Sequence, residues 1–299
     1  MNAAENVFVS QSGEKELVAE GLNVLIPDGE QDAAFKVLTS LALVPKIRVH
    51  IISSGKRPRT RYSRFTASYY VRRGTSEQEW FDQIREVVRH RRIDVILPVH
   101  AEAIGFACRW REQLAAVAAL PFLPETWAFD IAFDKGTLAN FLHEHNLPSP
   151  KTVPAARALD RPEIGFPLLI KPRRLSGGRG IQVCPDRKSL EEFVLTHQSS
   201  LEDYIVQEFI EGKDLCATLF CKDGKVLAHT LRQWTRPSPR PFAPSFSVRL
   251  IHHPQLSDVV ERLMAALSWS GIANVGTRYN ERTGRPEILD FNPRFGGNL

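Results

Sequence analysis

A lysine at the end of an apolar run stands just before a cluster of glycines. The run ends on Lys171, and Gly177, Gly178, Arg179 and Gly180 follow it. A lysine on a rigid strand beneath a glycine-rich loop can hold phosphate groups, with one fixed charge below them and backbone N–H groups above. The pattern is not a G-x-x-x-x-G-K-[ST] loop, whose lysine comes after its glycines. A plain glycine turn is the alternative interpretation.

A carboxylate and an amide stand two residues apart in the segment EILDFNPRFGG. Because side chains alternate across a strand, we expect Asp290 and Asn292 to share one face, with Ile288 as their apolar neighbour. Oxygen ligands of this kind suit Mg²⁺ bridged to phosphates, and an arginine just beyond them, Arg294, suits the terminal phosphate. A purely structural strand end, closed by the Asn-Pro pair, is the alternative.

The elements in the first part of the chain alternate between strands and helices. Nearly continuous apolar strands separated by helices predict a parallel sheet covered on both faces. Strands are expected over 22–27, 47–53 and 93–99, and helices over 32–43 and 76–90. Ser76 and Glu79 form the pattern of a capping box at the start of the second helix. No G-x-G-x-x-G turn follows the first strand, so this sheet alone indicates no cofactor site.

The pattern changes after a boundary near 121–125. Antiparallel hairpins with helices on one side predict an α+β architecture there, and Asp223-Gly224 is a favoured two-residue hairpin turn. Strands are expected over 167–170, 204–212, 215–220, 226–234, 272–280 and 286–292, helices over 134–148 and 257–271, and a Pro-rich segment over 236–245. We therefore predict an α/β N-terminal parallel-sheet domain over 1–124 and an α+β domain over 125–299.

The composition is that of an ordinary soluble globular protein, with 43% hydrophobic and 24% charged residues. No apolar run reaches the ~18 residues of a membrane span. The N-terminus has neither the basic nor the apolar region of a signal peptide. The four cysteines form no C-x-x-C pair, which favours reduced, buried thiols. We expect a cytoplasmic protein that does not associate with membranes.

The net charge of +5 raises the question of a nucleic-acid partner. Basic residues gather between Lys56 and Arg73, with aromatic side chains interleaved, as in proteins that combine base stacking with phosphate contacts. However, 34 acidic residues are spread elsewhere, and no nucleic-acid-binding motif is present. A basic loop in solvent, or one that lines a site for a small anion, is the favoured interpretation, and no nucleic-acid partner is expected.

Four motifs occur in a characteristic order: DKGTLANFLHEHNLPSPKT, FPLLIKPRRLSGGRG, VQEFIEGKD and EILDFNPRFGG. The series resembles the ATP-grasp superfamily, particularly the branch of carbamoyl-phosphate synthetase large subunits and carboxylate–amine ligases. The resemblance spans Glu125 to the C-terminus, and the preceding sheet resembles the α/β domain found before it in the family. It implies that 125–299 is an ATP-grasp domain, whose two α+β subdomains grip ATP.

The resemblance also assigns roles to individual residues. It implies ATP and Mg²⁺ (or Mn²⁺) as cofactors. Phosphate contacts fall to Lys135, Lys171 and Arg294, the closing loop to Gly177, Gly178, Arg179 and Gly180, adenine to Glu208, Phe209 and Ile210, ribose to Asp214, and the metal to Asp290 and Asn292. Related enzymes carry a Gln or Glu metal ligand where this chain has Gly276.

The activity implied is that of a ligase, in which ATP converts a carboxylate to an acyl phosphate and an amine then displaces phosphate. Arg232 and Arg249 are candidate clamps for the carboxylate substrate, since they lie between the ribose and metal motifs. The expected partners are a small-molecule carboxylate and an amine, and a homo-oligomer is left open. The alternatives are carboxyphosphate or carbamoyl-phosphate chemistry, and nucleotide binding without turnover. The latter would fit Gly276 and a chain that ends soon after Arg294.

Overall fold

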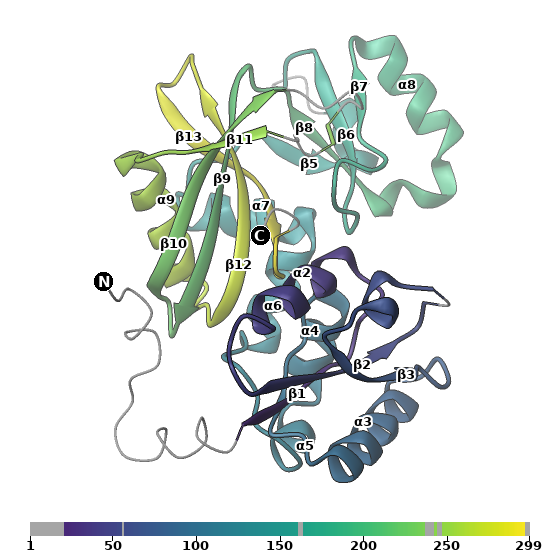
Figure 1. Cartoon of the computed structure of the whole chain (residues 1–299). Helices are drawn as coiled ribbons and strands as arrows, with labels where there is room; N and C mark the ends of the chain where they lie inside the picture. Colours follow the sequence, from purple (N-terminus) through teal and green to yellow (C-terminus); the bar gives the residue numbers. More distant parts are fainter. Residues whose placement is uncertain (1–20, 56, 161–163, 237–241, 244–246, 297–299) are drawn as a thin grey trace. The chain divides into compact units, whose positions relative to one another are not determined.

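The chain divides into two compact units in a computed structural model that describes residues 21–55, 57–160, 164–236, 242–243 and 247–296. The first unit ends at Pro121, and the second spans Phe122–Gly296. Figure 1 traces the elements of both units in chain order.

The first unit is built on a parallel sheet of order β3-β2-β1-β4, the N-terminal sheet. Its strands are β1 Leu22–Ile26, β2 Ile47–Ser53, β3 Thr66–Val71 and β4 Val95–Ile96. Its helices are α2 Asp32–Leu41, α3 Glu77–Arg91, α4 Ala101–Arg109 and α5 Arg111–Ala115. The capping box is present, because Ser76 Oγ accepts from the Glu79 N–H while the Glu79 carboxylate accepts from the Ser76 N–H. The predicted parallel sheet is confirmed.

Two segments of the first unit differ from the prediction. The strand expected over 93–99 is reduced to β4, because the chain beyond it is held by a buried carboxylate: Asp28 accepts hydrogen bonds from the N–H groups of Val99 and His100. The basic segment is only partly a loop, since β3 runs through it and pairs with β2. The residues of β3, TASYYV, are β-branched or aromatic and favour a strand over the charges that flank them. Lys56 lies outside the described residues.

The second unit holds two antiparallel sheets. The large sheet has the order β11-β10-β9-β12-β13, and the small sheet has the order β5-β8-β6-β7. The large sheet comprises β9 Gly212–Lys222, β10 Lys225–Arg236, β11 Ser247–Leu250, β12 Gly271–Asn280 and β13 Arg285–Asn292. The small sheet comprises β5 Thr152–Pro154, β6 Leu168–Pro172, β7 Gln182–Cys184 and β8 Tyr204–Glu208. The helices are α6 Thr126–Phe133, α7 Lys135–Glu144, α8 Arg187–Thr196 and α9 Pro254–Ala266. This α+β arrangement after a parallel-sheet unit confirms the predicted fold class.

The local signals in the second unit explain its elements. Asp223 and Gly224 both have positive φ, 49° and 76°, as the tight turn between β9 and β10 requires. Helix α9 begins earlier than predicted, because His253 caps it and Pro254 occupies the first helical position. The Pro-rich segment 236–245 falls mostly outside the described residues.

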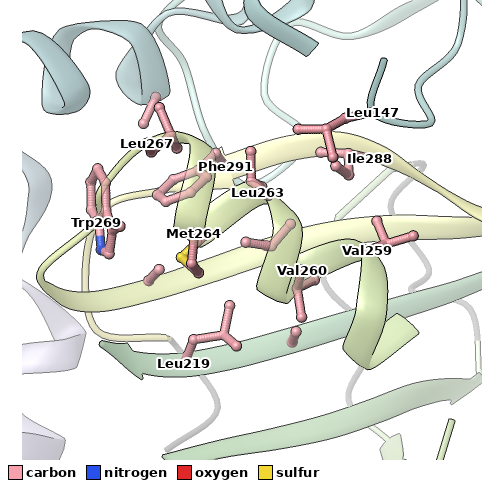
Figure 2. Close-up of a cluster of buried hydrophobic side chains, with 14 of the residues drawn as sticks. Leu147, Leu219, Val259, Val260, Leu263, Met264, Leu267, Trp269, Ile288 and Phe291 are labelled. Carbon is pink, nitrogen blue, oxygen red and sulfur yellow. The ribbon is translucent and has the colours of Figure 1, made fainter. Parts of the chain in front are cut away.

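One face of the large sheet carries the main core of the second unit. Figure 2 shows Leu263 and Met264 of α9 among side chains from the large sheet, together with Trp269, which follows the helix. Alternate residues of β9, Leu215, Ala217, Leu219 and Cys221, point into this core. The residues between them therefore face the other side of the sheet. The small sheet has a separate core that includes Leu190 and Phe193 of α8.

A β-bulge in β13 changes the predicted orientation of one residue. Gly276 pairs with Asp290 but the next residue, Thr277, pairs with Ile288, so Leu289 is extra in the ladder. Ile288 and Phe291 consequently both point into the core. Strict alternation would place Ile288 on the same face as Asp290 and Asn292. The bulge reverses the alternation between Ile288 and Asp290, so Ile288 lies on the opposite face.

No helix among the described residues has both the length and the apolar character needed to cross a membrane. The four cysteines are free and buried.

Candidate active site

Lys171 is a buried cation at the end of β6. Its side chain is 5% exposed, and its ammonium donates to Gln207 Oε1 at 2.5 Å. Gln207, on the neighbouring strand β8, is itself fixed by donating to Thr152 Oγ1 at 2.9 Å. Burial lowers the pKa of Lys171 from 10.5 to about 8, with the charge of Asp290 acting in the opposite direction and that of Lys135 adding to the decrease. The structure thus holds a desolvated ammonium group near a carboxylate.

Lys135 connects three elements of the second unit. It is the first residue of α7, and its ammonium lies 3.3 Å from Asp290 Oδ1 on β13. The same group donates to the carbonyl of Leu175, at the start of the glycine loop, at 2.6 Å. Lys135, Lys171 and Asp290, which are distant in sequence, are therefore neighbours, as the phosphate and metal assignments require.

Asp134 anchors the residues that lead into the loop. It caps α7 by accepting from the N–H groups of Gly136 and Thr137. Its carboxylate also accepts from Arg173 Nε at 2.8 Å and Arg174 Nε at 3.2 Å. Although burial raises the pKa of Asp134, hydrogen bonds from Arg173 and the two backbone groups outweigh it and hold the pKa below 3.8. Asp134 thus pairs with both arginines that stand between Lys171 and the glycine loop.

The glycine loop between β6 and β7 needs its glycines for conformation. Gly177, Gly178 and Gly180 have φ values of 71°, 75° and 75°, which side chains disfavour. At Gly178 a Cβ would also lie 2.1 Å from the Phe242 carbonyl oxygen, whereas at Gly177 it would meet open space. Arg179, between these glycines, donates to the Ser176 carbonyl at 3.3 Å.

The predicted metal pair and Arg294 form a chain of hydrogen bonds. Asn292 Nδ2 donates to Asp290 Oδ2 at 3.0 Å, and Arg294 Nη2 donates to Asn292 Oδ1 at 3.2 Å. Burial lowers the pKa of Arg294; the charge of Asp290 counteracts this, while that of Arg179 lowers the pKa further. Arg179 and Arg294 are therefore close enough to affect each other, so the loop and the residues just after β13 bring two guanidinium groups to one region.

Gly276 lies beside this cluster. It pairs with Asp290 on one side and with Cys216 on the other. A Cβ built at Gly276 would lie 3.7 Å from Asp290 Cβ, an ordinary van der Waals distance. The backbone therefore has room for a side chain at the position where the family resemblance predicts a Gln or Glu ligand.

The residues assigned to adenine and ribose are linked by an arginine that the sequence analysis did not select. Arg278 of β12 donates to Asp214 Oδ1 at 2.8 Å and to the Ile210 carbonyl at 2.9 Å. Its guanidinium carbon lies 5.8 Å from the centre of the Phe209 ring. Glu208, the other member of the set, accepts from Arg282 Nη2 at 2.9 Å. In the sequence, Arg278 is marked only by its place in the expected strand IANVGTRYN. Its partner Asp214 is 64 residues away, so no local pattern predicts the pair.

The two arginines proposed as a substrate clamp lie on opposite faces of the large sheet. Arg232 is 7% exposed and contacts Cys216 and Thr218, on the face away from the α9 core. Arg249 is exposed and donates at 3.0 Å to Gln233, its partner in the β10–β11 ladder. Because Gln233 follows Arg232 in a strand, the two arginines point to different sides. Only Arg232 shares the face of Asp290 and Asn292.

In the second unit, the cations Lys135 of α7 and Lys171 of the small sheet lie near the carboxylate of Asp290 in the large sheet. The profile of the family described as the ATP-grasp domain matches residues 132–298. The chain belongs to this family, as the four sequence motifs predicted.

Relatives by sequence include carbamoyl phosphate synthase large chains. That of Thermomicrobium roseum is 26% identical over 230 residues, which are 71% of this chain and 21% of the relative. That of Mycobacterium tuberculosis is 31% identical over 115 residues, 36% of this chain and 10% of the relative. The chain thus spans only a small part of the length of these relatives.

Solved structures with a similar fold cover most of the chain. The biotin carboxylase domain of 2-oxoglutarate carboxylase from Hydrogenobacter thermophilus, in complex with MgADP, ADP and bicarbonate, has a TM-score of 0.69 and 16% identity. The match covers 92% of this chain and 64% of that one. An L-amino acid ligase from Bacillus licheniformis has a TM-score of 0.67 and 19% identity, over 93% of this chain and 68% of that one.

Proposed function

We propose that this protein is an ATP-dependent ligase, which activates a small-molecule carboxylate as an acyl phosphate for attack by an amine. The observation that carries the proposal is the convergence of Lys135, Lys171, Arg179 and Arg294 on Asp290 and Asn292 in one unit. Similarity to an L-amino acid ligase and to a biotin carboxylase domain in complex with MgADP supports it. In this proposal the ATP-grasp domain begins near Glu125.

The cations would neutralise the phosphates of ATP and hold them in place. Lys171 is well suited, because an ammonium that is already desolvated loses little hydration when a phosphate binds. The glycine loop, with Arg179, would close over the phosphates and exclude water. The backbone at 208–210 would bind adenine, and Asp214 would accept from the ribose hydroxyls. Since Arg278 already pairs with Asp214, it would share this carboxylate with the ribose.

The residues present fit a magnesium ion. Asp290 and Asn292 offer carboxylate and amide oxygens on one face of β13, the ligand type that Mg²⁺ prefers. No group of three His, Cys, Asp or Glu side chains gathers in the part of the chain that the structure describes. Mg²⁺ retains several waters and shares oxygens with phosphates, so two protein ligands are compatible with it. When bound, it would neutralise charge on the transferred phosphoryl group.

Arg232 is the residue we propose for the carboxylate substrate. It lies on the face of the large sheet that carries the metal pair, and its guanidinium is held by Thr218. A planar guanidinium matches a carboxylate with two parallel hydrogen bonds. We propose a cytoplasmic location, where free thiols such as the four found here remain reduced.

A phosphate-release screen tests the proposal. The purified chain is supplied with ATP and Mg²⁺, and amino acids and other small carboxylates are paired with amines. We expect release only when both acceptors are present, and none from Asp290→Asn. Asp258→Asn, a matched change on the exposed face of α9, should behave as wild type. ATP binding without release for any pair would instead support the alternative of a binding protein, and release that requires bicarbonate would support carboxyphosphate chemistry.

A further inference from the structure

A hollow lies on the α9 side of the large sheet, beside the start of that helix. Its volume is about 320 Å³, and its walls come from β9, β10, β12 and residues 251–255. This volume is at the lower end of the range for small-molecule sites, about 300–1,000 Å³.

The hollow is separate from the candidate active site because strands alternate their side chains. Lys213 and Leu215 line the hollow, whereas Asp214 between them pairs with Arg278 on the opposite face. Tyr279 is the ladder partner of Lys213, and Gln233 is that of Leu215. These four side chains therefore form one continuous patch on the α9 side of the sheet.

Three polar side chains that line the hollow, Lys213, Gln233 and His253, have hydrogen-bond donors available for a ligand. Lys213 has no acceptor atom in its side chain, and no carboxylate among the described residues pairs with it. Gln233 already uses its oxygen to accept from Arg249, at 3.0 Å, which leaves its amide N–H groups. His253 Nδ1 accepts from the Leu256 N–H at 3.2 Å, so in this tautomer its proton is on Nε2.

The remaining lining residues add few acceptors and an apolar surface. Gln255 differs from Gln233, because its N–H group donates to the Gly284 carbonyl, 3.4 Å away, and its oxygen is left as an acceptor. None of the described residues that line the hollow is acidic. Leu215 and Ile251 are apolar, and the rings of His253 and Tyr279 lie with centroids 5.7 Å apart.

We propose that this hollow is a second ligand site, distinct from the ATP site, for a small organic anion with a flat apolar portion. Lys213, with the donors of Gln233 and His253, would bind a carboxylate or phosphate group, and the wall of Leu215, Ile251 and Tyr279 would cover the apolar portion. An anionic ligand is favoured because the hollow offers an ammonium group and hydrogen-bond donors, and no acidic side chain lines it.

Calorimetric titration of the full chain tests the site with three probes: phenyl phosphate, benzoate and inorganic phosphate. We expect phenyl phosphate or benzoate to bind with a Kd below about 1 mM, and inorganic phosphate about tenfold more weakly. Removing one charge-assisted partner with Lys213→Ala should weaken binding about tenfold. Lys225→Ala, at an exposed position of β10, is the matched control, and Lys171→Met tests whether the probe occupies the ATP site; both should bind as wild type.

Several results would overturn the proposal. Absence of binding by all three probes would remove the site. Equal affinity of wild type and Lys213→Ala would place the probe elsewhere, and loss of binding in Lys171→Met would place it at the ATP phosphates. Inorganic phosphate that binds as tightly as phenyl phosphate would refute the apolar wall. Because none of these measurements uses ATP, they hold whether or not the chain is a ligase.

Discussion

Replacing Lys171 by methionine should make the protein more stable and a poorer binder of ATP. Methionine keeps most of the volume of the side chain without its charge. In wild type, burial lowers the pKa of Lys171 from 10.5 to about 8, and this shift corresponds to about 3 kcal/mol of unfavourable free energy at pH 7. The substitution removes this cost, but it leaves the buried Gln207 oxygen without its ammonium partner, which costs about 1–2 kcal/mol. The net expectation is a gain of about 1–2 kcal/mol at pH 7.

The pH dependence has a definite sign. Between pH 8 and 10.5 the unfolded state holds a proton on Lys171 that the folded state has lost. The contribution of Lys171 to the free energy of unfolding therefore rises with pH across this window and is constant below it. We expect the stability advantage of Lys171→Met to decrease by about 3 kcal/mol between pH 7 and pH 10.5. Urea unfolding of the two proteins at several pH values measures this difference, in which the titration of other groups cancels.

The same variant should bind Mg–ATP at least tenfold more weakly at pH 7, about 1.4 kcal/mol, because a charged hydrogen bond to phosphate is lost. Wild-type affinity should also fall as pH rises through about 8, while the variant shows no such fall. A stability difference that does not change with pH would refute the buried-ammonium argument. Equal ATP affinity at pH 7 would remove Lys171 from the site.

Three further predictions concern the surrounding residues. Asp290→Asn should eliminate phosphate release and weaken Mg²⁺-dependent ATP binding. Gly276→Gln should be tolerated or raise activity, because a Cβ at this position makes ordinary contacts. A Mg²⁺ titration in which Asp290→Asn matches wild type would contradict the metal assignment. Gly177→Ala should lower the free energy of unfolding by about 1 kcal/mol, because residue 177 has a φ of 71°. Gly178→Ala should lower it further, because the added Cβ would meet the Phe242 carbonyl. Equal unfolding free energies for the two variants would show that this contact is not maintained. Asp134→Ala should destabilise the second unit by about 1–2 kcal/mol, because the cap of α7 is lost. Since folding lowers the pKa of Asp134, the wild type should be the more stable protein above pH 4, and this difference should disappear as pH falls below 3.8. A stability difference that persists at pH 2 would contradict the prediction.

The parts of the site that the sequence predicted are those with local signals. Lys171, the glycine loop and the pair Asp290–Asn292 each lie within a few residues of the pattern that marks them. The contacts that complete the site are not local: Lys171 reaches Gln207 36 residues away, and Arg278 reaches Asp214 64 residues away. No periodicity predicts such pairs, because the register between strands decides them.

Strand register also explains two orientations that the sequence patterns do not give. Arg232 and Arg249 are 17 positions apart on different strands, and only the β10–β11 pairing places them on opposite faces. Ile288 was placed with Asp290 by alternation, which the extra residue Leu289 interrupts. In the first unit, β3 was obscured by surrounding arginines, although its own residues favour a strand.

The anchoring of the glycine loop by Asp134 has a consequence for timescales. Arg173 is fixed by Asp134 and by the backbone of Lys135 and Asp203, and Gln182 is fixed in its ladder with Ile170. Only the short segment between them is left to move, so opening and closing need not shift α7 or the small sheet. Opening of a lid over a bound ligand takes microseconds to seconds, a range that overlaps typical turnover at about 1–10³ s⁻¹. In the proposed ligase, movement of this loop can therefore limit the rate, as well as chemistry or nucleotide release.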